Sequence, residues 1–160
     1  MKKIIIFISL TFIFITCASV QSIHTQENKV YKVGDTGPSG GFVFYDKGER
    51  TDGWQYLEAA PQEFEFETNW NSAKDMCRLL NINNTTGWRL PDRDELSFMY
   101  LNLKQKGLGN FSNDSYWSST EDSGIFKFTV YHNFGTGIVL VADRLGRGFV
   151  PYKVRAVRQF

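Results

Sequence analysis

The sequence predicts an α+β fold in which antiparallel strands flank two helices near the middle of the chain. The first observation is a change of period near residue 70, where apolar residues begin to recur every three to four positions. The second is another helical stretch from about residue 92 to residue 106. The third is that the flanking runs are rich in aromatic and β-branched residues, separated by glycine, asparagine or aspartate. Strands grouped around helices in this way are typical of the α+β class.

The N-terminus predicts an exported protein. Two lysines precede an apolar run over residues 4–15 that is too short for a stop-transfer helix and is typical of a secretory signal. Cys17 follows this run directly, where a bacterial lipoprotein carries its acylated cysteine. We therefore expect residues 1–17 to be a signal peptide that ends at a candidate lipobox, and residues 18–29 to be a flexible linker.

Two processing routes remain open. The lipobox match is loose, because Phe14 and Thr16 stand where leucine and a small residue are usual. Acylation of Cys17 is nevertheless favoured, since the chain has two cysteines and one lies where lipidation needs it. The acyl chains would anchor the protein to the outer membrane or cell surface. The alternative is ordinary cleavage after Ser22, which would give a secreted or periplasmic protein.

Composition argues against several kinds of site. Beyond the leader only Cys77 remains, so no intramolecular disulfide can form despite export. The chain has 18 Lys and Arg against 17 Asp and Glu, and losing Lys2 and Lys3 with the leader leaves a small acidic excess. This charge does not favour a nucleic acid partner. Histidine and cysteine are too scarce for a zinc site, and no EF-hand spacing occurs, so we expect no metal and no cofactor.

Residues 30–160 are expected to form one domain that begins with strands. VYKV (30–33) and GFVFYD (41–46) are predicted as strands on either side of the glycine-rich turn GDTGPSGG. GWQYLEAAP (53–61) is predicted as a third strand that ends at its proline. EFEFE (63–67) alternates acid and phenylalanine, as a strand or extended loop with one solvated face would.

Two helices are predicted next. Ala73, Met76, Cys77 and Leu80 have helical spacing, and Asn69 or Asn71 can cap the start. Because Cys77 lies on this apolar face, we expect a buried thiol rather than a nucleophile.

The second helix follows GWRLP (87–91) and begins in a cluster of charges. Asp92 and Glu95 have the spacing of a capping box, so these acids are interpreted as a helix start rather than a catalytic or metal site. Leu96, Met99, Tyr100 and Leu103 follow on one face, and Gly107 ends the helix. The rest of the chain is predicted to be strands and turns, in the runs YWSSTE, IFKFTVYH, GIVLVAD and YKVRAVRQF.

These motifs carry a family resemblance. GWRLP…EL, YWSSTE and VRAVR, together with the opening YKVGDTGPSGGFVFYDKG…GWQYLEAAP, resemble the bacterial Lcl C-terminal domain family over residues 30–160. That family takes its name from the last domain of a collagen-like adhesin. The resemblance implies a C-type-lectin-like fold, with paired terminal strands and two helices beside a sheet, and a role in surface binding.

The sequence departs from classical C-type lectins. Their disulfides are impossible here, and their Glu-Pro-Asn, Gln-Pro-Asp and Trp-Asn-Asp sugar motifs are missing, so calcium-dependent sugar binding is not implied. Formylglycine-generating enzymes, a related branch, also show an RLP…E element, but their chemistry needs reactive cysteines in a cleft. A degenerate enzyme of that type would require an exposed and reactive Cys77.

Charge distribution supplies candidate ligand-binding residues. Residues 46–67 are strongly acidic and residues 141–160 strongly basic. Arg144 and Arg147, in the turn DRLGRG, could face an anionic glycan. Tyr131 and His132 are expected at an exposed rim suited to stacking on a sugar, whereas Trp117 is expected in the core. Lys153, Arg155 and Arg158 are expected to form a solvated strand face or to pair with the acidic segment.

The sequence therefore predicts an exported, adhesin-like binding module without catalysis, whose partner is a glycan, anionic ones included, or a surface protein. The alternatives are a structural envelope lipoprotein with no soluble ligand and the degenerate formylglycine-generating-type enzyme.

Overall fold

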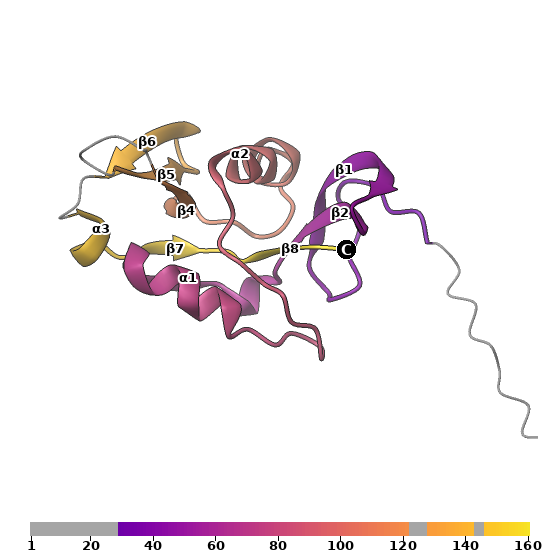
Figure 1. The fold of residues 1–160 in the computed structure, drawn as a ribbon. Helices are drawn as coiled ribbons and strands as arrows, with labels where there is room; N and C mark the ends of the chain where they lie inside the picture. Colours follow the sequence, from indigo (N-terminus) through magenta and orange to yellow (C-terminus); the bar gives the residue numbers. More distant parts are fainter. Residues whose placement is uncertain (1–28, 122–127, 143–145) are drawn as a thin grey trace, which may run out of the picture.

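The computed structural model of the protein describes residues 29–121, 128–142 and 146–160. The predicted signal peptide with Cys17 lies outside these residues, as do linker residues 18–28 and Arg144. The described residues form an α+β fold, as predicted, with two sheets and two principal helices (Figure 1). No helix in the described ranges is both long and apolar enough to cross a membrane.

A three-stranded sheet joins the two ends of the domain. Its order is β1 (Phe42–Thr51), β2 (Trp54–Ala59) and β8 (Val157–Gln159), and both strand pairs are antiparallel. The amides of Gln55 and Tyr56 also donate to the carbonyl of Phe160, so the C-terminus is held against β2. Early strands and the last strand lie side by side in Figure 1, an arrangement compatible with a C-type-lectin-like fold.

The second sheet has five strands. Its order is β3 (Phe66–Thr68), β7 (Tyr152–Val154), β4 (Ser115–Glu121), β5 (Thr129–Asn133) and β6 (Ile138–Ala142). Neighbouring strands are antiparallel except β4 and β7, which run parallel and share one aligned pair, Tyr116 with Lys153. A single aligned pair means that β4 and β7 soon diverge, and this opens a cleft that is described below.

The C-terminal run YKVRAVRQF was predicted as one strand, and this prediction is wrong. The chain forms β7 in one sheet and β8 in the other, with Arg155 and Ala156 between them. The Ala156 carbonyl accepts a hydrogen bond from the Ala60 amide, while the Arg155 side chain turns into the interior. The link therefore carries the chain from one sheet to the other, and this is why apolar and polar residues do not alternate through it.

Helix α1 (Trp70–Arg78) begins at Asn69, one of the two predicted caps, whose side chain accepts a 3.0 Å hydrogen bond from the Ser72 amide. Trp70, Ala73 and Cys77 are buried, which confirms the buried thiol. Met76 is 39 % exposed, so the predicted apolar face is narrower than its spacing indicated. In this helix of nine residues, the buried side chains that face the core are those of Trp70, Ala73 and Cys77.

Helix α2 (Arg93–Asn102) begins at Asp92 with the predicted capping box. Leu96, Met99 and Leu103 are fully buried, as their spacing predicted. A 3₁₀ turn, η2 (Lys104–Lys106), follows and ends at Gly107, which has a φ of 69°. The left-handed conformation suits glycine and turns the chain away from the helix.

The remaining elements are short, and two predictions about them are wrong. A 3₁₀ turn, η1 (Gln62–Phe64), precedes β3, and helix α3 (Gly146–Phe149) occupies a segment that was not predicted to be helical. Residues 30–33 do not form the predicted strand, and Val30 is 77 % exposed. This segment is held instead by Tyr31, whose ring packs edge-on against Tyr56 and Phe160.

Two clusters of buried side chains form the core. One lies between α2 and the strands of both sheets and includes Phe44, Leu96 and Phe134. The other lies against α1 and includes Trp88, Val154 and Trp117, which is fully buried as predicted.

Candidate functional site

The charged residues at the start of α2 stabilise the N-terminus of this helix. The Asp92 carboxylate accepts a 2.8 Å hydrogen bond from the Glu95 amide, and the Glu95 carboxylate accepts one of 2.9 Å from the Asp92 amide. Arg89 binds Glu95 with both ends of its guanidinium group. These hydrogen bonds raise the pKa of Arg89, against the opposing effect of burial. The carboxylates of Asp92 and Glu95 therefore stabilise the start of α2, as the capping-box interpretation predicted.

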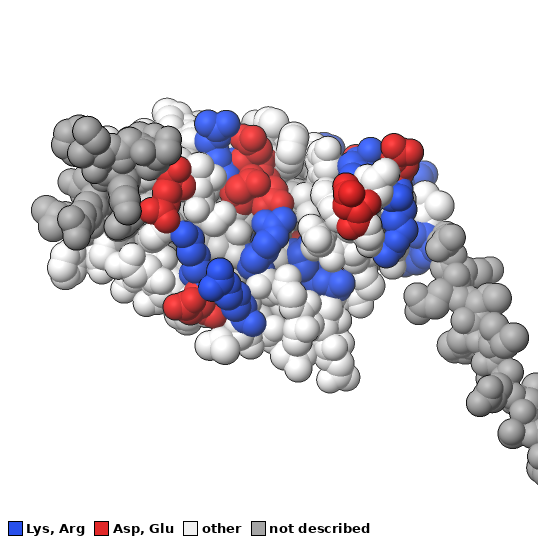
Figure 2. Space-filling model, viewed as in Figure 1, with Lys and Arg blue, Asp and Glu red and all other residues white. Residues whose placement is uncertain are grey.

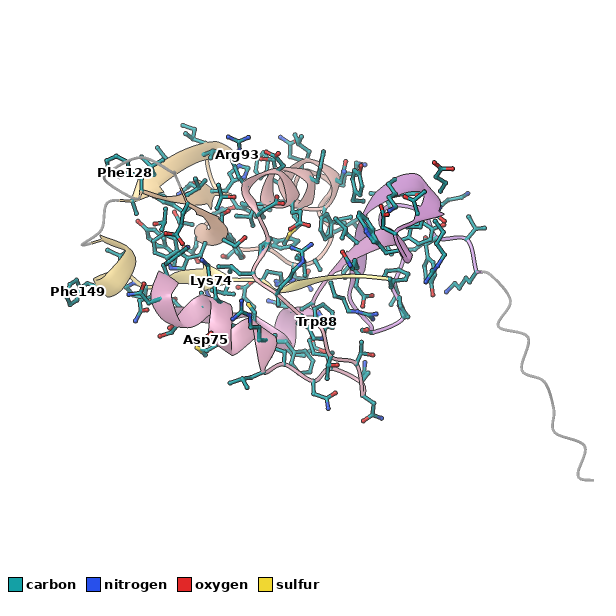
Figure 3. All side chains as sticks on the ribbon, viewed as in Figure 1. Lys74, Asp75, Trp88, Arg93, Phe128 and Phe149 are labelled. Carbon is teal, nitrogen blue, oxygen red and sulfur yellow. The ribbon has the colours of Figure 1, made fainter. Side chains whose placement is uncertain are left out.

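A groove lies next to this helix start, between α1 and the link that precedes α2. It encloses about 350 Å³ and is lined by three basic side chains, Lys74, Arg78 and Arg89, together with Leu90, Asp92 and Ser119. Lys74 projects from α1 (Figure 3). Figure 2 shows basic side chains gathered on this face of α1, with acidic side chains around them. We call this feature the basic groove.

Two of the three cations of the basic groove, Lys74 and Arg78, have acidic partners that solvent reaches, whereas the partner of Arg89, Glu95, is buried. Lys74 lies 3.1 Å from Glu121, and Arg78 lies 3.5 Å from Asp75, in a pair whose side chains are 71 % and 78 % exposed. Exposed ion pairs of this kind contribute little stability, about 0–1 kcal/mol. Lys74 and Arg78 can therefore exchange their acidic partners for an external anion at small cost, whereas Arg89 remains bound to Glu95.

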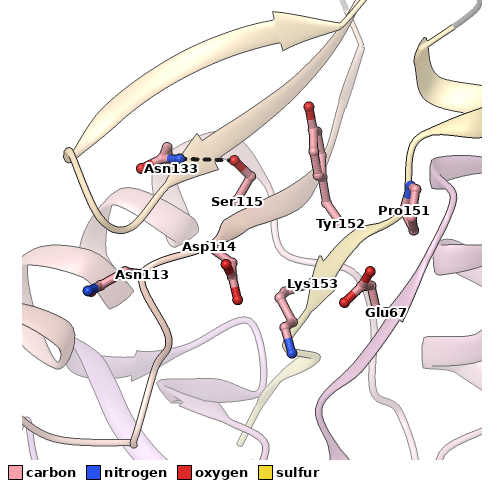
Figure 4. Close-up of a pocket in the computed structure, with 8 residues that line it drawn as sticks. All are labelled: Glu67, Asn113, Asp114, Ser115, Asn133, Pro151, Tyr152 and Lys153. Carbon is pink, nitrogen blue, oxygen red and sulfur yellow. Dashed lines mark hydrogen bonds between the residues drawn. The ribbon is translucent and has the colours of Figure 1, made fainter.

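A second hollow, the polar cleft, lies where β4 and β7 diverge. It encloses about 290 Å³, and its polar lining comes from four strands or their ends: Glu67, Asn113, Asp114, Ser115, Asn133, Tyr152 and Lys153 (Figure 4). Asn133 is fixed, because its oxygen accepts from the amides of Gly135 and Thr136 while its nitrogen donates to the Ser115 hydroxyl. Tyr152 packs against the rings of Trp117 and Tyr131, with ring centroids 4.5 and 4.7 Å away.

The predicted rim residues Tyr131 and His132 have different positions. Tyr131 is partly buried and packs beside Trp117 and Tyr152. His132 is only 3 % exposed, so its expected position at an exposed rim is wrong. Successive side chains of β5 point to opposite faces, and His132 faces the interior, where its ring lies 5.0 Å from that of Tyr100 on α2.

The predicted basic residues divide in a similar way. Arg147 lies in α3, and Arg144 lies outside the described residues, as does the predicted lipidation site Cys17. Arg155 and Lys153 pair with Glu65, and Arg158 pairs with Glu58. The expectation that these three residues pair with the acidic segment is thus confirmed.

The thiol of Cys77 is fully buried, and burial raises its pKa to about 12. A thiol with this pKa stays protonated near neutral pH, and the thiolate is the reactive form. Among the described residues, no three His, Cys, Asp or Glu side chains are grouped so that they could hold a metal ion.

Neither the basic groove nor the polar cleft was predicted from the sequence. The groove residues are separated in the chain, and Lys74 and Arg78 have the i, i+4 spacing of one helix face, which is the one signal that could have indicated a basic surface on α1. The residues of the polar cleft have no such local pattern, because they come from segments far apart in sequence.

No curated protein matches the sequence of this chain. A family model does match residues 48–158, which is more than half of the chain, and it describes the Lcl C-terminal domain. The matched range contains GWRLP, YWSSTE and VRAVR, whereas residues 30–47 of the noted resemblance lie outside it. The chain belongs to the Lcl C-terminal domain family.

Proposed function

We propose that this domain is an exported, non-catalytic surface module of the adhesin type, and that it binds a glycan carrying anionic groups in the basic groove. The observation that carries the proposal is the convergence of Lys74, Arg78 and Arg89 on one hollow. Arginine suits sulfate and carboxylate groups because its planar fork can donate two parallel hydrogen bonds. The family, named after a domain of an adhesin, supports a role at the cell surface.

The acids beside the groove do not cancel this attraction. Asp92 and Glu95 accept hydrogen bonds from the first turn of α2, and the helix N-terminus carries a partial positive charge that offsets theirs. The acidic partners of Arg78 and Lys74, Asp75 and Glu121, are accessible to solvent, and the Lys74 ammonium group also lies 3.9 Å from the centre of the Trp70 ring. An anionic polymer that approaches Lys74 and Arg78 therefore meets Asp92 and Glu95 in compensated form, and it releases the exposed carboxylates of Glu121 and Asp75 into solvent.

Binding of the full chain to immobilised heparin, polygalacturonate and neutral dextran tests the proposal, with and without calcium and across a salt series. We expect calcium-independent binding to the two anionic polymers that weakens with salt, because added ions screen exposed charges. Lys74→Ala/Arg78→Ala should abolish most of it. Lys32→Ala/Lys106→Ala removes the same charge from exposed positions outside the groove and should have little effect.

Two results would count against the proposal. One is retention by dextran equal to that by heparin, and the other is equal loss of binding in the groove variant and its charge-matched control. An Arg144→Ala/Arg147→Ala variant separates the groove from the basic turn that the sequence indicated. No retention by any polymer would favour the structural envelope lipoprotein.

A surface protein is the second candidate partner, and strand β6 favours it. Ile138, Val139, Leu140 and Val141 are 39–59 % exposed, and β6 lies at an edge of the five-stranded sheet. An uncharged edge strand offers backbone groups to another strand. Leu140→Lys should reduce protein association without changing heparin binding, and chemical crosslinking on the cell surface would measure it.

Anchoring through an acylated Cys17 would place this module on the membrane surface, and globomycin-sensitive processing of the full chain tests it. A Cys17→Ser chain should then be released into the soluble fraction. Unchanged membrane association of Cys17→Ser would favour cleavage after Ser22 and another mode of retention.

A further inference from the structure

The polar cleft has free hydrogen-bonding capacity. In the described part of the chain, the carboxylates of Asp114 and Glu67 accept no hydrogen bond and form no ion pair, although both line the cleft. The amide and hydroxyl on the opposite wall are held in place, because Asn133 donates to Ser115. Figure 4 shows these side chains around the opening between the strand ends. The cleft thus combines fixed polar groups with two acceptors that lack a protein partner.

Lys153 is the positively charged residue that lines the polar cleft. Its ammonium group lies 3.7 Å from Glu65, but Glu65 is also bound by the buried Arg155 at 2.6 Å. Because Arg155 already compensates Glu65, Lys153 retains positive charge for a ligand in the cleft. The lining then carries two free carboxylates and one ammonium group, a balance that opposes a negatively charged ligand.

Tyr152 also lines the cleft, and its ring points to the opposite side of β7 from the Lys153 side chain (Figure 4). Packing against Trp117 and Tyr131 fixes this ring, and burial raises the pKa of its hydroxyl, so the phenol stays neutral near pH 7. A fixed aromatic ring beside hydrogen-bonding groups can contact the apolar face of a sugar at little entropic cost.

We infer that the polar cleft is a second binding site, distinct from the basic groove, that takes a neutral sugar unit. Sugar hydroxyls donate to Asp114 and Glu67 and accept from Lys153 and the Asn133 amide. An acidic sugar would place its carboxylate near the two free carboxylates and bind less well. The cleft and the basic groove share no lining residue, so a glycan can be recognised by its neutral units at one site and by its anionic groups at the other.

Nitrogen-15 NMR of the full chain, in a detergent without a sugar headgroup, tests this inference. The probes are the methyl glycosides of glucose, galactose, mannose, N-acetylglucosamine and glucuronic acid. We expect saturable shifts of the Ser115 amide and the Asn133 side-chain amide with at least one neutral glycoside, and weaker binding of the glucuronide. Asp114→Asn and Glu67→Gln should each weaken binding by about tenfold or more, the usual effect of losing a hydrogen bond to a charged group.

Matched controls separate this site from the groove. Glu63→Gln and Asp94→Asn remove the same charge from exposed positions outside the cleft and should leave the affinity unchanged. Lys74→Ala/Arg78→Ala should also leave it unchanged, even if it abolishes heparin binding. The inference is overturned if no neutral glycoside shifts these amides, if the glucuronide binds as tightly as the best neutral one, or if both cleft variants bind normally.

Discussion

Arg155 and Glu65 form an ion pair in the interior of the domain. The Arg155 side chain is fully buried, its Nη2 lies 2.6 Å from the Glu65 Oε2, and its Nη1 donates to the carbonyls of Ala60 and Gly109. Glu65 also accepts a 3.0 Å hydrogen bond from the Tyr116 hydroxyl. The pair connects the segment between the two sheets to the acidic part of the chain. A residue that the sequence presented as one of a basic strand is therefore part of the core.

Removal of Arg155 should strongly destabilise the fold. Arg155→Met leaves Glu65 buried beside an incomplete set of partners, and breaking a buried pair in this way costs about 3–5 kcal/mol. Urea unfolding measures the free energy of unfolding. Arg155→Met/Glu65→Gln should recover part of the loss, because no buried charge is then left unpaired and Lys153, which also pairs with Glu65, is accessible to solvent. A cost for Arg155→Met no greater than that of Arg78→Met, in an exposed pair, would contradict this role for the pair.

Asp92, as the N-cap of α2, should contribute more to the stability of the fold than its exposed neighbour Asp94. Asp92→Ala removes the acceptor for the Glu95 amide, and the loss of an N-cap costs about 0.5–2 kcal/mol of stability. Asp94→Ala removes a carboxylate of equal charge that, among the described residues, binds only the exposed Arg93 side chain. Thermal unfolding of the two variants compares them, and equal midpoints would show that charge at the helix N-terminus matters more than the cap itself.

Acid should destabilise the protein through His132. Burial lowers the pKa of His132 below its ordinary value of 6.5, and the nearby backbone of Gly137 offsets only part of this effect. No hydrogen-bond partner in the described structure reaches either ring nitrogen, and the ring lies against Tyr100 and Phe134. Below about pH 6.5 the unfolded chain binds a proton at this residue before the folded one does, so stability falls as the pH decreases.

Urea unfolding at pH 7.5, 6.5 and 5.5 measures this dependence. His132→Phe keeps an aromatic ring against Tyr100 and removes the titrating group, so its stability should change less between pH 7.5 and 5.5. An equal loss in both proteins would assign the acid sensitivity to other groups.

The two helices could be predicted because their signals are local. The α2 cap needs only Asp92 and Glu95, three residues apart, and the buried positions Leu96, Met99 and Leu103 follow at helical spacing. The start of α1 at Asn69 is equally local. Backbone amides at a helix end are satisfied within one turn, so the sequence contains the whole arrangement.

The division between β7 and β8 could not be predicted in this way. Arg155 interrupts the strand because Glu65, 90 positions earlier, lies inside the fold to receive it. The same holds for the polar cleft, where Glu67 and Lys153 meet through a β3–β7 pairing that no nearby motif indicates. For Tyr131 and His132 the sequence indicates that their side chains point to opposite faces of β5. Which of the two faces is buried depends on where α2 packs, and this cannot be read from the strand itself.

The thiol of Cys77 should not react in the folded protein, and this outcome bears on the degenerate formylglycine-generating-type enzyme. The side chain is fully buried and burial raises its pKa to about 12, so both access and thiolate are limited at neutral pH. A small maleimide should modify Cys77 rapidly in urea. In the native state the rate of modification should be lower by a factor on the order of a hundred or more. A Cys17→Ser chain carries Cys77 as its one thiol and makes the assay specific. Modification at similar rates in both states would show that this part of α1 opens readily and would restore the enzyme alternative, because a thiol that solvent reaches can also reach a substrate.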